Sequence, residues 1–239
     1  GLPSVAPGTG SWFAFISDCR RSNPVFRRME GKGKRGRGES GDGAAVRRME
    51  TCAAKRQRQE TELWDASFAG NLEVVRRSLA EDQSALNKAA ITGTGSEKGD
   101  TPLICAVRGN QLHVVRFLVG EAQADVNVGT RQNGATPIYI AAQEGHLDVV
   151  RFLASEAQAD VNKARTDTGS TPVWIAAHQG HLDVVRFLAI EAQADVNKAR
   201  TDNGSTPVMI AARQGHLEMV RFLIHSATAN LHLVTVYGG

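Results

Sequence analysis

Three histidines, His146, His181 and His216, recur along the sequence at intervals of 35 residues. Histidine is the commonest metal ligand in proteins, so such a row raises the question of a ladder of metal sites. Units built of packed helices lie about 10 Å apart, which is too far for neighbouring imidazoles to share one ion. We therefore interpret these histidines as polar residues that begin a helix in a repeated unit, and we predict no metal site.

The other reactive residues do not form a catalytic pattern. Cys105 stands at the repeat position that Ile140 and Ile175 occupy, so we interpret it as a small buried hydrophobic residue. The sequence contains no GxSxG, no Walker-type phosphate loop, no CxxC pair and no HExxH. We predict that the protein is not an enzyme and binds no cofactor. Its 3 cysteines are odd in number and widely separated, which favours reduced thiols and an intracellular setting.

Charged residues recur in step with the histidines. Acid–base pairs three residues apart predict solvated ladders on an outer helix face. These pairs are Asp148/Arg151, Asp183/Arg186 and Glu218/Arg221. In an alternative interpretation the recurring arginines, Arg116, Arg151, Arg186 and Arg221, grip an acidic partner. We favour the ladders, because the neighbouring carboxylates cancel the positive charge.

An internal repeat supplies the elements that must position these residues. The block TPLICAV begins at Thr101, and its variants begin at Thr136, Thr171 and Thr206, so the period is 35 residues. The blocks HLDVVRFL and EAQADVN recur at constant offsets behind it. Threonine is a good N-cap and proline suits the first helical position, so each copy predicts a helix, a tight turn and a second helix. A single copy is too small to fold alone, so neighbouring copies must stack.

The blocks TPIYIAA, GHLDVVRFL and ADVN resemble the ankyrin repeat, and the resemblance covers the chain from Thr61 to the C-terminus. It implies L-shaped units in which a hairpin-like turn projects at right angles to two antiparallel helices. It also implies a concave face, formed by the turns and the first helices, that binds protein partners.

The sequence departs from the family pattern at two places. The family usually has histidine as the fourth residue of the block that begins with Thr-Pro, where this chain has Ile104, Tyr139, Trp174 and Met209. The family's glycine after the second helix is replaced by Gln123, Gln158 and Gln193. Each copy is also two residues longer than the usual 33. We therefore expect the second helix to run further and the turns to be longer.

We predict an all-α, ankyrin-type helix-turn-helix solenoid of five repeats behind a disordered basic N-terminal segment. The repeats are 61–100, 101–135, 136–170, 171–205 and 206–239. Polar Arg77 and Ser78 replace the Phe and Leu of VVRFL in the first copy, which indicates a capping repeat. The last copy keeps the apolar set Val220, Phe222, Leu223 and Ile224, so we expect an exposed apolar patch on the last helices. One hypothesis is that the natural array continues beyond Gly239 or that the chain pairs through this end.

Residues 1–60 differ in charge from the rest of the chain. They hold 13 Lys and Arg against 6 Asp and Glu, whereas residues 61–239 hold 15 against 19. Residues 30–43 consist almost entirely of glycine and charged residues, which predicts disorder, and residues 44–60 are compatible with a short helix.

The run at Lys55, Arg56 and Arg58 fits a loose nuclear-import pattern, so we expect a cytoplasmic or nuclear protein. A solvated linker is the favoured interpretation of this segment, with at most weak binding to nucleic acid. Met29 or Met49 is a candidate start.

The favoured function is an intracellular scaffold or adaptor that holds another protein on the concave face. The alternatives are the recognition arm of a larger enzyme or channel and RNA binding through the basic segment. No apolar stretch approaches the roughly 18 residues that a membrane-spanning helix needs.

Positions that change between copies while the frame stays fixed are the candidate contact residues. They are Arg108, Gln143, Glu144, His178, Gln179, Arg213 and Gln214 at the ends of first helices, and Arg131, Gln132, Arg165, Asp167, Arg200 and Asp202 in the turns. Tyr139 and Trp174 either add aromatic anchors or fill the layer between repeats. The hypothesis predicts that Arg165→Glu with Arg200→Glu weakens partner capture and leaves melting unchanged.

Overall fold

The computed structural model of the chain describes residues 62–88 and 99–227. Several predictions fall outside these residues: the disordered basic segment, the short helix over 44–60, the import-like run, residues 89–98 of the first repeat and the end of the last copy. Within the described ranges the chain is helical and contains no strand. The prediction of an all-α helix-turn-helix solenoid is therefore confirmed, and the number of five repeats stays a prediction.

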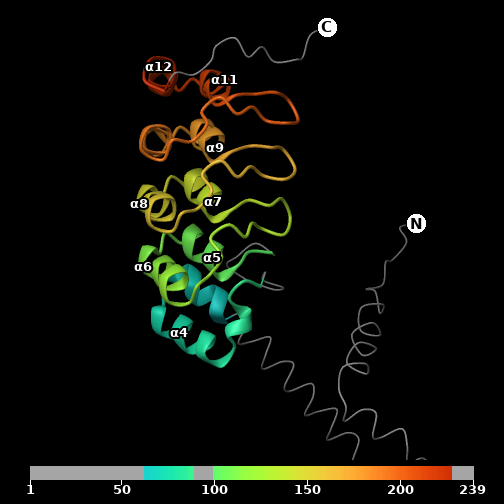
Figure 1. Ribbon diagram of the computed structural model, residues 1–239, viewed down its shortest axis with the longest axis vertical. Helices are drawn as coiled ribbons and strands as arrows, with labels where there is room; N and C mark the ends of the chain where they lie inside the picture. The colour runs from blue at the N-terminus through green and yellow to red at the C-terminus, as the bar shows by residue number, and fades with distance from the viewer. Residues whose placement is uncertain (1–61, 89–98, 228–239) are drawn as a thin grey trace, which may run out of the picture. The chain divides into compact units, whose positions relative to one another are not determined.

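The helices alternate along the chain between a first and a second helix of each unit (Figure 1). Residues 62–69 are helical and precede α4 (Leu72–Glu81) and the short η1 (Gln83–Ala85). The first helices that follow are α5 (Pro102–Arg108), α7 (Pro137–Glu144), α9 (Pro172–Gln179) and α11 (Pro207–Arg213). The second helices are α6 (Leu112–Arg116), α8 (Leu147–Arg151), α10 (Leu182–Arg186) and α12 (Leu217–His225). Successive first helices contact one another, and so do successive second helices.

The Thr-Pro blocks start the first helices as expected. In α7 the Thr136 hydroxyl accepts a hydrogen bond from the amide of Tyr139 at 3.4 Å, and Pro137 occupies the first turn. Thr171 does the same for the amide of Trp174 at 3.2 Å. These hydroxyls satisfy amides that have no partner inside the helix. Each first helix therefore begins at a fixed point relative to the turn before it.

Three of the second helices, α6, α8 and α10, have 5 α-helical residues each, but the helical backbone continues beyond them, as the longer repeat predicts. Each continues as a π-helical turn: η2 (Phe117–Glu121), η3 (Phe152–Glu156) and η4 (Phe187–Glu191). A π turn takes up extra residues without ending the helix. Gln123, Gln158 and Gln193 then adopt positive φ values of 63, 54 and 53°, where the family's glycine would be expected. A positive φ is uncommon for a residue other than glycine, and here it recurs at the same position of three successive units.

The core consists of equivalent apolar side chains stacked unit on unit. Leu118, Leu153, Leu188 and Leu223 share one repeat position and are all 0% exposed. Cys105 is buried, as its interpretation as a core residue predicts. Phe222 and Leu223 are buried as well, and Val220 and Ile224 are partly buried against the core, so none of the four residues expected in the exposed patch is fully exposed. Leu217, at the start of α12, is exposed instead.

The histidines at the start of the second helices join one unit to the next. The Nε2 atoms of His146, His181 and His216 lie 3.4, 3.0 and 3.2 Å from backbone carbonyl oxygens at the end of the preceding first helix. The ring of His181 also covers Gly145, and that of His216 covers Gly180, so closely that a Cβ on either glycine would lie 2.7 Å from a ring atom. The interpretation of these residues as structural is supported by both contacts.

The prediction of acid–base ladders within the second helices is wrong for most of the pairs. Arg116, at the equivalent position of α6, bonds to Glu156 of the following unit through two hydrogen bonds of 3.0 and 2.9 Å, and lies 4.7 Å from the ring centre of Phe152. Arg151 likewise pairs with Glu191, 3.5 Å away, and covers Phe187. A neighbouring ring face and carboxylate together attract the guanidinium more than one exposed acid in its own helix.

Arg186 covers Phe222, and the corresponding acid is replaced by Ser226. Only Arg221 forms the expected pair, with Glu218 at 3.2 Å. The alternative in which this arginine row grips an acidic partner is weakened, because Arg116, Arg151 and Arg186 are already engaged between units.

Candidate partner-binding face

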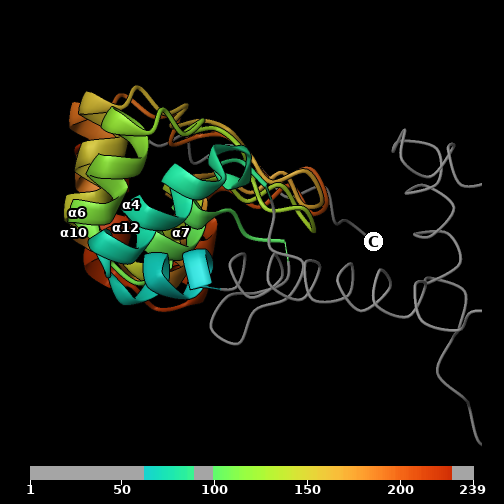
Figure 2. The ribbon, with the colours of Figure 1, turned by 90° about the horizontal axis from the view of Figure 1, so that it is seen from below.

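The turns project to one side of the helix stack, next to the first helices, and lie above one another (Figures 1 and 2). Each turn is closed on itself: the amide of Arg165 donates to the Ser170 carbonyl at 2.9 Å. Neighbouring turns are joined by further backbone hydrogen bonds of 3.0 Å, from Thr166 to Asn133 and from Thr201 to Thr168. The turns therefore form a connected row that holds its side chains at set intervals.

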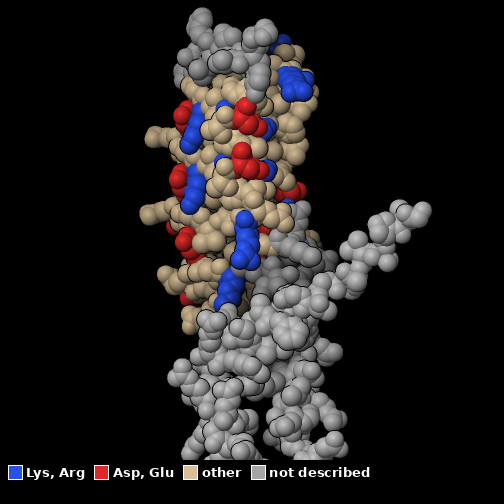
Figure 3. Space-filling view, turned by 90° about the vertical axis from the view of Figure 1, so that its right-hand side faces the viewer, with Lys and Arg blue, Asp and Glu red and all other residues tan. Residues whose placement is uncertain are grey.

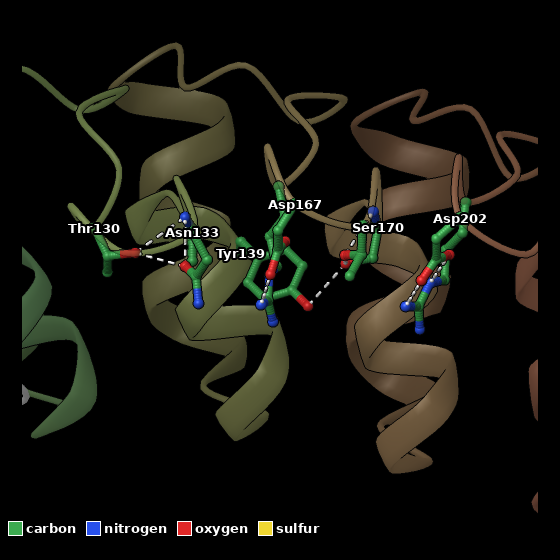
Figure 4. A network of polar contacts seen from close by, with 10 residues as sticks. Thr130, Asn133, Tyr139, Asp167, Ser170 and Asp202 are labelled. Atoms are coloured by element: carbon green, nitrogen blue, oxygen red, sulfur yellow. Dashed lines mark hydrogen bonds and ion pairs between the residues drawn. The ribbon is translucent and has the colours of Figure 1, made fainter.

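Two of the turns carry the same arginine–aspartate pair (Figure 4). Nε and Nη2 of Arg165 donate to Oδ1 and Oδ2 of Asp167 at 3.0 and 2.6 Å. Arg200 bonds to Asp202 in the same two-pronged way, with 2.9 Å from Nε to Oδ1. Such paired bonds fix the plane of the guanidinium group.

Each of these guanidinium groups also covers an aromatic ring of the preceding first helix. Arg165 lies 5.7 Å from the ring centre of Tyr139, and Arg200 lies 4.6 Å from that of Trp174. Arg165→Glu with Arg200→Glu would uncover both rings and place new carboxylates beside Asp167 and Asp202. We therefore revise the expectation that this variant melts unchanged, because it removes two structural contacts.

The arginines shift the titration of their partners. The hydrogen bond from Arg165 holds the pKa of the Asp167 carboxyl below its ordinary value of 3.8, and Arg200 lowers the pKa of Asp202 in the same way. A lowered pKa in the folded state stabilises the fold at pH values above 3.8. That contribution is lost as the pH falls through the lowered pKa.

Arg165→Gln is therefore expected to raise the pKa of Asp167 and to leave that of Asp202 unchanged. Carboxyl carbon shifts followed by NMR between neutral and strongly acidic pH measure both values in one sample. The turn at Asp202 serves as the internal control, because its pair is the same and its arginine is intact. Equal behaviour of the two aspartates in the variant would show that the arginine does not cause the shift.

The turn at 130–135 differs from the two that follow. Thr130 stands where they have Arg165 and Arg200, and its hydroxyl donates to Oδ1 of Asn133 at 2.6 Å. Gln132 stands where they have aspartate. This turn therefore has neither the guanidinium that covers a helix nor the carboxylate at its tip.

A polar hollow of about 200 Å³ lies between this turn, the ends of α5 and α7, and the turn that follows. Arg108 and Arg165 line it, together with Gln132, Asn133 and Gln143. Asp100 also lines it, and its carboxylate accepts a hydrogen bond from Nε of Arg108 at 2.8 Å. The Asp100 side chain is 1% exposed, so this ion pair is largely removed from water.

The structure separates the predicted contact residues into exposed and engaged ones. Arg131, Gln132, Glu144, Asp167, Gln179, Asp202, Arg213 and Gln214 are exposed, whereas Arg108, Gln143, Arg165, His178 and Arg200 are half-buried. Of these, the hollow brings together Arg108, Gln132, Gln143 and Arg165.

The two predicted aromatic anchors are not accessible. Tyr139 is 1% exposed and shares a hydrogen bond of 3.2 Å with the Ser170 hydroxyl, and Trp174 is 5% exposed and stacks on His178. Their burial favours the second interpretation, in which both rings fill the layer between units. We no longer count them as contact residues.

Three residues of the site, Asp100, Thr130 and Asn133, were missed by the sequence reasoning. Asp100 has a visible signal, because it precedes the Thr-Pro block where the other copies have Ala135, Ser170 and Ser205. Thr130 has one too, because it interrupts a column of arginines. The sequence analysis grouped Arg131 with Arg165 as turn arginines, whereas the residue that lies one repeat before Arg165 is Thr130.

Charges on the turn side are mixed in sign (Figure 3). Among residues 62–88 and 99–227, no cluster of three or more His, Cys, Asp or Glu side chains is arranged to hold a metal ion. No helix in the same ranges has the length and apolar character needed to cross a membrane.

Comparison with known proteins gives one family. The family model described as ankyrin repeats (3 copies) matches residues 63–165 and 158–234, which is more than half of the chain. A search of curated proteins gives no match.

Proposed function

The chain belongs to the ankyrin repeat family, and from that premise we propose that it is a scaffold or adaptor that binds another protein across its turns and first helices. Ankyrin repeats are generally protein–protein interaction modules and are typically not catalytic. In this proposal the partner contacts side chains that differ from unit to unit, and the backbone that carries these side chains is the same in each unit.

One observation carries the proposal. The ends of the first helices expose polar residues at one repeat position, Glu144, Gln179 and Gln214, and the residue before each of them changes from unit to unit, from Gln143 to His178 to Arg213. The frame beneath them is held by the same histidine and threonine contacts in the units that begin at Thr136, Thr171 and Thr206, and by backbone hydrogen bonds from turn to turn. A rigid row of differing polar groups is suited to recognise one extended surface, because little side-chain and backbone freedom is lost on binding.

The test is capture from a lysate of the source cells by the full chain and by two matched variants. Gln179→Glu with Arg213→Glu changes the proposed face. Gln193→Glu with Arg221→Glu makes the same two changes on the exposed outer side, after η4 and in α12. We expect the first variant to lose about tenfold or more in affinity for the captured protein, and the second to bind as the parent does.

Equal capture by the parent and both variants, or loss only in the outer variant, would contradict this assignment of the binding face. Circular dichroism and melting of each variant establish that the comparison is between folded proteins.

A further inference from the structure

The second helices stack on the side away from the turns, and one pair of contacts recurs between them (Figure 1). At three successive junctions an arginine of one unit lies over a phenylalanine ring of the next unit and pairs with a glutamate of that unit. The ion pairs are Arg76–Glu121, Arg116–Glu156 and Arg151–Glu191, with N–O distances of 2.9, 2.9 and 3.5 Å.

The fourth junction, between α10 and α12, has the arginine and the ring but not the acid. Arg186 lies 5.4 Å from the ring centre of Phe222. Ser226 follows Glu191 by one repeat and stands where the earlier units have glutamate. Asp183, in the same helix as Arg186, does not pair with it, and no other acid among residues 62–88 and 99–227 does so. The ring face is therefore the one described group that attracts this guanidinium.

The backbone places Ser226 as it places the glutamates. The amide of Ala227 donates to the Phe222 carbonyl at 3.2 Å, just as the amide of Ala192 donates to the Phe187 carbonyl at 3.0 Å one unit earlier. α12 has no π turn, unlike the second helices before it, but the bond that closes its end is the same. Ser226 is also exposed, so its hydroxyl is accessible to an enzyme.

A phosphate group on Ser226 provides the negative charge that glutamate provides in the earlier units. Phosphoserine carries a charge of about −1.5 to −2 at pH 7, and opposite an arginine it forms charge-assisted hydrogen bonds. A negative group at the C-terminal end of a helix is unfavourable in itself, yet three earlier units carry a carboxylate at this position. We propose that Ser226 is a phosphorylation site, and that its phosphate pairs with Arg186 and holds the last unit against the one before it.

The modification takes a protein kinase and ATP. The bond between Oγ of Ser226 and the γ-phosphorus forms as the bond from that phosphorus to the β–γ bridging oxygen breaks, ADP leaves, and the hydroxyl proton passes to a base of the kinase. The ion pair is exposed and therefore weak. It changes how often the last unit opens and not whether the array folds. The inference is independent of the partner and of the face that binds it.

The pairing is tested on the full chain with phosphoserine incorporated at position 226 during translation. The second pKa of phosphoserine is about 6, and a neighbouring guanidinium lowers this pKa because it favours the dianion. Phosphorus NMR measures the pKa in the parent and in two variants. We expect the pKa to rise by about 0.5 in Arg186→Gln and by less than about 0.2 in Arg151→Gln. Arg151 is the matched control, because it makes the corresponding contacts with Phe187 and Glu191 one unit earlier.

The effect on the last unit is measured by amide hydrogen exchange of the same proteins. Phosphorylation should slow exchange in α12 by about two- to fivefold, and this difference should disappear in Arg186→Gln. An equal pKa in the parent and Arg186→Gln, or slower exchange that persists in Arg186→Gln, would overturn the pairing.

The occurrence of the modification is tested on the protein isolated from its source cells in the presence of phosphatase inhibitors. Mass spectrometry of peptides that contain Ser226 should find phosphate on this residue, and treatment with a phosphatase should remove it. Peptides without phosphate at Ser226 would overturn the assignment of the site.

Discussion

Arg108→Gln is expected to lower the free energy of unfolding by about 3 kcal/mol, although the sequence suggests a surface residue. The reason is Asp100, whose side chain is 1% exposed and accepts a hydrogen bond from Nε of Arg108. Removing the guanidinium takes a hydrogen bond and a neighbouring positive charge away from a carboxylate that is shielded from water, which is strongly destabilising. Urea unfolding of the parent and the variant, followed by circular dichroism, measures the difference.

The chain also supplies the control. One unit later, Ala135 and Gln143 occupy the positions of Asp100 and Arg108, so Asp100→Ala with Arg108→Gln converts the pair into one that the array already accepts. We expect the double variant to recover most of the stability lost by Arg108→Gln. Arg131→Ala, a change in an exposed arginine nearby, should shift stability by no more than about 0.5 kcal/mol. A double variant as unstable as the single one would show that burial of the Asp100 charge is not the cause.

Gly180→Ala is expected to cost about 2–5 kcal/mol. Gly180 has a φ of 84°, a conformation that costs an L-residue about 1–2 kcal/mol. A Cβ there would also lie 2.7 Å from the ring of His216, and overpacking of this kind adds about 1–3 kcal/mol. The substitution therefore disturbs the contact by which one unit rests on the next.

Gly215→Ala separates the two costs. Gly215 has nearly the same φ, 78°, but no described atom lies within 4 Å of its Cβ position. Gly215→Ala should therefore lower the free energy of unfolding only by the cost of the positive φ, about 1–2 kcal/mol. In a His216→Ala background the cost of Gly180→Ala should fall to the same level. If Gly180→Ala and Gly215→Ala are equally destabilising in the parent, the contact with His216 contributes little to the stacking.

Much of the fold could be predicted because the same local sequence signals occur in several copies of the repeat. The Thr-Pro start of α7 recurs before α9 and α11, and the structure realises it each time as a side-chain cap. The extension of the second helix could be predicted from the longer period. Its form, a π turn that ends at a glutamine with positive φ, could not, because no rule of residue propensity favours either feature.

The candidate site was less predictable, because a single sequence shows which positions vary but not which of them face solvent. Arg165 and Arg131 both read as exposed turn arginines, yet Arg165 covers Tyr139 and only Arg131 is exposed. The sequence predicts a pair between Arg151 and Asp148 of the same helix, whereas in the structure Arg151 pairs with Glu191 of the next unit. Contacts between units depend on the rotation from one copy to the next, which the spacing along the chain does not specify.

The most direct test of the account is amide hydrogen exchange of the full chain, alone and with the captured protein bound. The account predicts slower exchange in the complex at the turns 130–135, 165–170 and 200–205 and at the ends of α7, α9 and α11. Slower exchange confined to α8, α10 and α12, with the turns unaffected, would contradict it.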